Sequence, residues 1–552
     1  MNRRIWIVLG AAALLRAVYL LDYRAHSVFW DSMLLDAEVY DAWARRIVEG
    51  DWLGGTQVFT LPPLYPYVVA LIYKLFGTSY AAVYVIQSVL GLVNIHFIHA
   101  IGRKVFGETV ALIAAVLAML YGSFMFMDAK LMSTTLALTL GLGLMRLLLL
   151  AGERQTLTLW GACGALAGLT ALARPETLLF VPLAAFWIWR VTSRPENRRA
   201  AAPVDQYALA GRHPWFAIAV FAAFVIVAVA PATMRNWVVS EDWSLSNLIS
   251  SQAGITFYQS NNPRARGLYV FLDDEGFSGN PRTQAEEEEK IAEREAGRDL
   301  KRSEVTRHWM NKGLAWIASD PGRYVVLEAR KLVRFLGSYE YSTEYIFYVE
   351  REAVISLWLA SLPFAAITAL ALAGMLMQAK TGFKAPALLL ILFVISNFLV
   401  AMIFYVSSRY RMPSAPYLIL FAASGLHRLH QGFRSPISGQ RTEAWIYSII
   451  AALLFLVFHP QVDASHRIQE ANVHYNAGNA WYNKQRYDDA VAEYDRALNG
   501  NPTNWRAWFN RGNALAELGR RDDAIASYRK VLEHNSRMDA ARRRIRSLGG
   551  TP

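Results

Sequence analysis

The run APALLLILFVISNFLVAMIFYV at residues 385–406 contains no charged residue. A helix needs about 20 predominantly apolar residues to cross the hydrocarbon core of a bilayer. This run therefore predicts a transmembrane helix, and ten similar runs accompany it at 5–21, 79–102, 109–127, 131–150, 157–173, 177–190, 215–231, 353–376, 412–427 and 444–458. Together they predict an α-helical polytopic membrane protein with about eleven transmembrane helices.

The composition supports this class. The chain has 552 residues, of which 54% are hydrophobic and 13% aromatic, and its mean hydropathy is +0.21. A soluble enzyme of this length would carry more charge. The net charge of +12 reflects basic loops beside the apolar runs, so it gives no reason to expect a nucleic-acid partner.

The basic residues of the short loops predict the orientation. They fall at alternate ends of successive runs, which places them all on one side of the membrane, and by the positive-inside rule that side is the cytoplasm. We therefore expect a multi-pass plasma (inner) membrane protein with a cytoplasmic N-terminus, and with the loops 22–78 and 232–352 and the tail 459–552 outside. The basic residues are Arg3, Arg4, Arg103, Lys104, Arg154, the run 190–212, Lys380, Lys384, Arg428, Arg434 and Arg441.

The tail repeats itself every 34 residues, as the pairs Gly478/Gly512, Ala490/Ala524 and Tyr494/Tyr528 show. This period is that of tetratricopeptide helix pairs, which bury aromatic residues between helices. Two copies and a basic closing helix, 539–548, bury little surface alone, so we expect the array to pack on something else. The predicted domains are a membrane domain, 1–458, and an all-α extracytoplasmic repeat domain, 459–552, which is either a docking site for a protein partner or a structural appendage.

The first outer loop carries an acidic segment, LLDAEVYDAW, at residues 34–43. Its apolar and aromatic positions recur at helical spacing, which predicts an amphipathic helix on the outer surface. Asp36 and Tyr40 would share a face of that helix, with Glu38 nearby. The simplest alternative is that Asp36 only caps the helix.

Three more charged groups follow at the predicted outer ends of apolar runs. Asp128 comes after the third run, where a membrane-facing charge is costly and usually functional or paired. Lys130 is its nearest candidate partner. Arg174 follows the fifth run, and Arg409 and Arg411 stand in SRYRMP between the ninth and tenth.

These groups suit a reaction between a hydroxyl and a lipid-linked phosphate. Guanidinium groups bind phosphate oxygens through paired hydrogen bonds, and a carboxylate accepts the proton of an attacking hydroxyl. Nucleotide sugars are absent outside the cell, so a sugar donor there would be lipid-carried. We assign catalysis to Asp36 and Asp128, donor phosphate binding to Arg174, Arg409, Arg411 and Lys130, and substrate contacts to Glu38 and Tyr40.

Further segments resemble the GT-C glycosyltransferases of the protein mannosyltransferase and aminoarabinose transferase type over residues 1 to about 430. The resemblance lies in the order of PPLYPY at 62–67, LFG at 75–77, Gln87, LARP at 172–175, RNW at 235–237, GITFY at 254–258, NNP at 261–263 with Gly267, and RYRMP at 409–413.

The resemblance implies transfer of a hexosyl or pentosyl group from a polyprenyl phosphate to an acceptor on the outer face, by inverting single displacement. Asp36 matches the first-loop catalytic acid, Asp128 the acid after the third span, and Arg174 a basic residue near the donor phosphate. Many relatives have Asp followed directly by Glu, whereas Ala37 separates Asp36 from Glu38 here. Which of the two is the base stays open; Asp36 is favoured because it shares a face with Tyr40.

The second outer loop is expected to cover the acceptor access. Residues 254–267 predict short extended pieces with turns, and 316–321 and 324–335 predict two amphipathic helices returning to the membrane. Two other functions fit parts of the sequence: a transporter or flippase of lipid-linked sugars, and a non-catalytic scaffold that docks partners through the tail. The acceptor, whether protein, lipid or glycan, stays open. So does the metal requirement, since two outer acids could hold a divalent ion.

Overall fold

The computed structural model describes residues 3–193, 214–278, 283–342, 344–459 and 464–551. Within them the chain is built from helices, and no strand is assigned beyond one isolated bridge between Tyr121 and Ser361. The predicted α-helical class is therefore confirmed. The basic run at 190–212 lies largely outside the described residues.

Among the described residues, six helices are long and apolar enough to cross a membrane. Five others are shorter or less apolar and correspond to the remaining predicted runs. The number of spans stays a prediction. The six are α1 (Arg3–His26), α4 (Tyr80–Phe106), α7 (Thr134–Arg154), α11 (Trp215–Ser240), α18 (Ala385–Ile403) and α21 (Ser438–Phe458), and the five are α5 (Glu108–Leu120), α8 (Leu157–Ala173), α9 (Phe180–Thr192), α17 (Phe364–Ala379) and α20 (Ala415–Arg434).

Two predicted runs are interrupted. The run 109–127 breaks at Tyr121, between α5 and the short α6 (Gly122–Asp128). The run 353–376 becomes the helix α17 only at Phe364. Pro363 disfavours helical backbone in the residue before it, and the N–H of Leu362 instead donates to the carbonyl of Leu120 at 3.1 Å. The two breaks therefore meet and stabilise each other.

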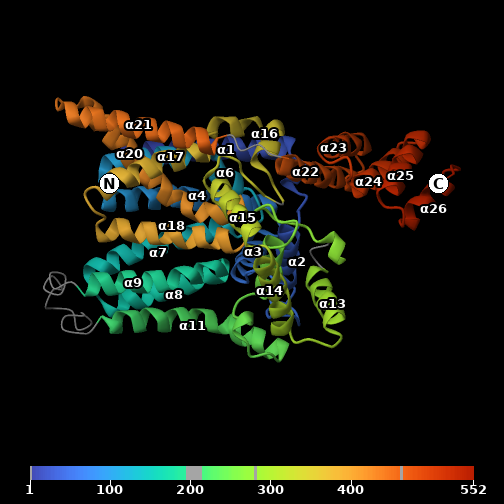
Figure 1. Cartoon of the computed structure of the whole chain (residues 1–552), viewed down its shortest axis with the longest axis horizontal. Helices are drawn as coiled ribbons and strands as arrows, with labels where there is room; N and C mark the ends of the chain where they lie inside the picture. The colour runs from blue at the N-terminus through green and yellow to red at the C-terminus, as the bar shows by residue number, and fades with distance from the viewer. Residues whose placement is uncertain (1–2, 194–213, 279–282, 343, 460–463, 552) are drawn as a thin grey trace. The chain divides into compact units, whose positions relative to one another are not determined.

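Small residues let the helices pack closely. In Figure 1, α7, α8, α9, α11 and α18 run side by side. A Cβ atom on Gly164 or Gly168 of α8 would clash with the backbone of α11 at Phe221 or Val225. Close backbone approach at small residues is the usual way in which membrane helices associate.

The second outer loop forms a small helical lobe. Its helices are α12 (Ala253–Ser260), α13 (Gln284–Ala296), α14 (Arg302–Ser319) and α15 (Pro321–Leu336). The prediction of extended pieces at 254–267 is wrong for its first half, because Ile255 and Tyr258 turn one helical face onto the buried Trp309. The two predicted amphipathic helices appear as the end of α14 and as α15.

Arg235 and Asn236 tie the two outer loops together at the end of α11. Arg235 donates to the carbonyls of Leu53 at 3.0 Å and Gly55 at 2.7 Å, and its guanidinium lies 4.0 Å from the Phe59 ring centroid. Asn236 accepts from the N–H of Phe59 at 3.1 Å and donates to two carbonyls of the second loop. The first loop is thus fixed by residues 180 positions later in the chain.

The chain divides into two compact units. The second contains the repeats and two segments of the outer loops, Leu21–Leu34 and Glu340–Ile355. The repeat helices are α22 (Ala464–Asn483), α23 (Tyr487–Gly500), α24 (Trp505–Glu517), α25 (Arg521–His534) and α26 (Asp539–Ser547).

The surface on which the repeat array was expected to pack lies within this second unit. The ring of His466 lies 5.2 Å from that of Tyr341, and the ring of Tyr345 lies 5.6 Å from that of Phe29. Tyr345 Oη also accepts from the N–H of Leu34 at 3.1 Å. The repeats therefore pack on two segments that the predicted boundary at 458 had placed in the membrane domain.

Candidate active site

The acidic segment of the first loop forms α2 (Asp36–Val48), whose buried face is apolar and aromatic. Asp36 is the first residue of the helix, so the N-cap position belongs to Leu35, which makes no side-chain capping hydrogen bond. Leu35, the residue before Asp36, has a positive φ of 46°. A residue other than glycine adopts this backbone conformation only where the surrounding structure holds it there. A carboxylate at this position gains from the helix dipole, but capping does not explain Asp36.

Asp36 pairs with Arg409. Its Oδ2 lies 2.6 Å from Nη1 of Arg409, and the side chains of Arg409 and Asp36 are 17% and 24% exposed. Arg409 belongs to a one-turn helix, α19 (Ser408–Arg411), that follows α18. Two segments 373 residues apart therefore bring a carboxylate and a guanidinium together, and both groups keep access to solvent.

Arg174 completes this group from the end of α8. Its Nη1 donates to the backbone carbonyl of Arg409 at 2.6 Å, and its Nε donates to Glu176 at 2.7 Å. Its guanidinium also lies 5.2 Å from the ring centroid of Tyr410. Three of the predicted site residues, Asp36, Arg174 and Arg409, thus lie in one place.

Tyr40 lies one helical turn after Asp36 and is buried. Its ring packs edge-to-face on Tyr65 at 5.0 Å, and its hydroxyl is hydrogen-bonded to Ser133. Burial, and then the charge of Asp36, raise the pKa of Tyr40 well above its ordinary value. The phenol is therefore a neutral hydrogen-bond donor. Glu38, half-buried on the same helix, stays a predicted substrate contact.

Asp128 is held by partners on both carboxylate oxygens. Its Oδ2 lies 2.9 Å from Nε of Arg16, and its Oδ1 accepts from Thr135 at 2.9 Å. Both members of the ion pair are almost fully buried. The partner of Asp128 is thus Arg16 and not Lys130, whose ammonium lies 4.6 Å from the ring centroid of Phe126. The sequence signal for Arg16 was a lone charge inside the first apolar run.

Gln87 connects the Asp128 segment to Tyr40. It accepts from the hydroxyl of Tyr65 at 2.8 Å and donates to the carbonyls of Asp128 and Lys130 at 2.9 and 2.8 Å. Since Tyr65 packs on Tyr40, this buried amide helps to fix the position of Tyr40, one helical turn after Asp36. Sequence reasoning noted Gln87 only as part of a motif.

Arg411 is fully buried. Its guanidinium donates to the carbonyls of Gly337 at 2.7 Å and Tyr339 at 2.8 Å, and it lies 4.3 Å from the ring centroid of Phe364. These contacts fasten the end of the second outer loop to α19. The predicted contact of Arg411 with the donor phosphate stays a prediction.

A cluster around Asp41 was missed from sequence. Asp41 accepts from Tyr73 at 2.6 Å and Tyr80 at 3.2 Å and pairs with Arg45 at 2.9 Å. It joins α2 to α3 (Leu64–Phe76) and to the start of α4. The spacing of Asp41 and Arg45, one helical turn apart, was the available signal.

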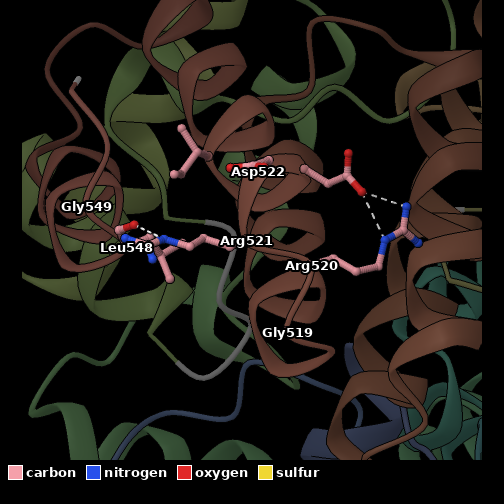
Figure 2. A pocket seen from close by; sticks show the side chains of 8 residues that line it. Gly519, Arg520, Arg521, Asp522, Leu548 and Gly549 are labelled. Carbon is pink, nitrogen blue, oxygen red and sulfur yellow. Dashed lines mark hydrogen bonds and ion pairs between the residues drawn. The ribbon is translucent and has the colours of Figure 1, made fainter.

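Within the described residues, no group of three or more His, Cys, Asp or Glu side chains is arranged to hold a metal ion. A cavity of about 710 Å³ lies at the end of the repeats, beside α25 and the residues after α26 (Figure 2). There Arg520 pairs with Asp523, and Arg521 donates to the carbonyl of Leu548, so both guanidinium groups are already engaged.

Two segments of the chain match known protein families. Residues 60–230 match the family described as dolichyl-phosphate-mannose-protein mannosyltransferase, and residues 475–542 match the tetratricopeptide repeat. The predicted resemblance is confirmed. The protein is a membrane protein with a glycosyltransferase-family segment and a C-terminal repeat array. The matched segment contains Gln87, Asp128 and Arg174 but neither Asp36 nor Arg409. No curated protein matches the chain significantly.

Solved structures give distant likenesses. The archaeal oligosaccharyltransferase AglB from Archaeoglobus fulgidus, in complex with an inhibitory peptide and a dolichol-phosphate, is 14% identical with a TM-score of 0.42 and is matched by 91% of this chain. The chain spans 59% of that protein's length. ArnT from Cupriavidus metallidurans, bound to undecaprenyl phosphate, is 15% identical with a TM-score of 0.43, over 96% of this chain and 80% of that one.

Proposed function

We propose that the protein transfers a sugar from a polyprenyl-phosphate donor to an acceptor hydroxyl on the outer face of the membrane. The observation that carries the proposal is the meeting of Asp36, Arg409 and Arg174. A carboxylate and two guanidinium groups are the parts that such a transfer needs, and the family match supports the class of reaction.

The two arginines are assigned to the donor phosphate. Asp36 and Glu176 balance their charges in the free protein, and the stack on Tyr410 limits the orientation of Arg174. Because these contacts already hold the two guanidinium groups in place, little side-chain conformational entropy is lost when they bind phosphate oxygens. As the bond to the sugar breaks, the phosphate gains charge, and Arg174 and Arg409 stabilise it at that moment.

Asp36 is assigned as the general base. The acceptor oxygen attacks the anomeric carbon and forms the new glycosidic bond, and the bond from that carbon to the phosphate oxygen breaks. The proton of the acceptor hydroxyl passes to Asp36, and polyprenyl phosphate leaves. Attack from the face opposite the phosphate inverts the anomeric centre.

The other predicted residues receive supporting roles. Tyr40 donates a hydrogen bond to a substrate oxygen, since its phenol stays neutral, and Glu38 is kept as a second substrate contact. Asp128, with both oxygens occupied, positions the turn that carries Lys130. Through Gln87 it also positions Tyr65, on which Tyr40 packs. Arg411 fastens α19 and so positions Arg409.

We assign the N-terminus to the cytoplasm and the site and the repeats to the outer side, because the basic residues of the short loops favour that orientation. A lipid-carried donor fits that side.

The test uses the full chain purified in detergent. It is incubated with labelled polyprenyl-phosphate sugars and cell-envelope fractions, and label in the acceptor fraction is measured. We expect transfer with at least one donor, and a loss of polyprenyl-phosphate affinity in Arg409→Gln. Movement of the labelled lipid across sealed vesicles without any transfer would indicate a flippase and overturn the proposal.

A further inference from the structure

Four membrane helices meet at Trp187 of α9. Nε1 of Trp187 donates to the carbonyl of Ala385, at the start of α18, at 2.7 Å. Its ring packs on the end of α7, where a Cβ atom on Gly152 would lie 2.7 Å from it, and lies 6.4 Å from the ring of Trp160, near the start of α8. We call this place the Trp187 junction. The candidate active site follows the opposite ends of α8 and α18, which run side by side with α7 and α9 in Figure 1.

Three basic residues stand at the helix ends that form this junction. Arg154 is the last residue of α7, Lys384 directly precedes α18, and Arg190 lies in the last turn of α9. No carboxylate of the described residues pairs with any of the three, and the acid beside Arg154 in the chain, Glu153, pairs with Lys104. The junction therefore carries positive charge that the described side chains leave unbalanced.

Solvation alone does not explain Arg190. Arg154 and Lys384 are exposed, and exposed basic residues on the predicted cytoplasmic side are expected from the positive-inside rule. Arg190 is half-buried, and its Nε is buried without a hydrogen-bond partner in the part of the chain that the structure describes. A charged donor that stays buried and unpaired costs free energy. We therefore expect the acceptor for this nitrogen to come from outside the chain.

The surface of α9 beside Arg190 is apolar and open. Phe186 lies one helical turn before Arg190 and Trp189 directly before it, and their side chains are 45% and 44% exposed. The two rings lie 6.2 Å apart. Because α9 ends at the junction, Phe186 is nearer than Arg190 to the middle of the membrane. A cation with exposed apolar rings below it fits a molecule that has an anionic head and apolar chains.

We infer that the Trp187 junction binds an anionic phospholipid through its phosphate group. Arg190 donates to the phosphate oxygens, for which a guanidinium group has the matching geometry. Arg154 and Lys384 attract the net negative charge of the head group, and the acyl chains lie along Phe186 and Trp189. Free phosphate and polyprenyl phosphate offer the same oxygens, so the test includes both. The inference does not depend on the proposed transfer reaction.

The test titrates the delipidated full chain in detergent with phosphatidylglycerol and measures bound lipid by native mass spectrometry. We expect one lipid to bind more tightly than the rest. Arg190→Gln should weaken this binding about tenfold, equivalent to about 1.4 kcal/mol, and Arg154→Gln, at an exposed position, should weaken it by a smaller factor. Phosphatidylcholine should bind more weakly than phosphatidylglycerol, because its choline cancels the charge of the phosphate. Inorganic phosphate at the same concentration should not displace the lipid, because it lacks the acyl chains.

The matched control is Arg434→Gln. Arg434 is an exposed residue at the end of α20, on the same predicted side of the membrane but outside the junction, so its substitution should leave the affinity unchanged. Thermal melts show which variants stay folded, and Arg154→Gln carries the test if Arg190→Gln does not. Equal effects of the junction and control variants, equal affinity for phosphatidylcholine, displacement by inorganic phosphate, or tighter binding of polyprenyl phosphate would each overturn the inference.

Discussion

Replacing Arg16 with methionine should destabilise the membrane domain. Arg16 is the ion-pair partner of Asp128, and the two side chains are 4% and 3% exposed. Gly91 lies against the pair so closely that a Cβ atom there would clash with both side chains. Water therefore has little room to replace the lost guanidinium, and Asp128 would keep only its hydrogen bond from Thr135.

The size of the effect follows from this burial. Removing one partner of a buried ion pair typically costs about 3–5 kcal/mol, because the other charge stays uncompensated. Asp128→Asn should also destabilise, since it leaves Arg16 unpaired. In the double variant both charges are gone, and the oxygen of the introduced amide can still accept from Thr135, so we expect more than half of the loss to be recovered.

The assay is the midpoint temperature of the detergent-purified protein, followed by size-exclusion chromatography after heating. Single variants at the wild-type midpoint, or a double variant whose loss equals the sum of the single losses, would refute the reasoning. The double variant also separates the two roles considered for Asp128. Sugar transfer near the wild-type rate supports positioning, and a stable but inactive double variant would return Asp128 to the catalytic groups.

Three further predictions concern the outer loops and the repeats. Arg235→Lys removes the paired hydrogen bonds to the first loop, so limited proteolysis within 51–57 should become faster. The pKa of Glu275 lies below its ordinary 4.5, because hydrogen bonds from Lys312 and Tyr258 outweigh the opposing effect of burial. The stability that Glu275 contributes is thus complete above pH 4.5 and lost as the pH falls below it, so proteolysis of the lobe should accelerate below that pH in the wild type and less so in Glu275→Gln. Gly478→Ala places a Cβ atom 2.6 Å from the ring of Tyr494, and overpacking of this kind costs about 1–3 kcal/mol, which should lower the melting temperature of the array.

Each of these has a matched control at an exposed position. Arg266→Lys should leave cleavage of the first loop unchanged, and Glu286→Gln should keep the wild-type response to pH. A Cβ atom on Gly439 meets no atom within 4 Å, so Gly439→Ala should leave the melting temperature of the array unchanged. A control that behaves like its test variant would show that the named contact is not the cause.

Apolar runs and the 34-residue period were enough to predict the helical class and the repeats, because both signals are local. The grouping of Asp36, Arg174 and Arg409 could also be predicted, because charges at the same predicted end of several spans share one level of the membrane. The level of a side chain along the membrane normal can be predicted from the sequence in this way. The direction in which a side chain points around its helix axis cannot, and neither can its partner when that partner is distant in the chain.

Three examples show where the sequence was not enough. Arg409 and Arg411 are two residues apart, yet one meets Asp36 and the other is buried among backbone carbonyls, because residues two positions apart on a helix point in different directions. Asp128 finds Arg16 at a distance of 112 residues, although Lys130 is its near neighbour in sequence. The sequence analysis missed the helix α12, because the turn residues Asn261 and Asn262 follow it directly. The helix is short, and its apolar face is recognised only from its packing on α14.

The most direct test of the central claim compares Asp36→Asn with Glu38→Gln at saturating donor lipid. A general base contributes about 10²–10⁴-fold to a rate. We therefore predict that Asp36→Asn slows sugar transfer by about 100-fold or more while polyprenyl-phosphate binding persists, and that Glu38→Gln has a smaller effect. Transfer by Asp36→Asn at the wild-type rate would contradict the account.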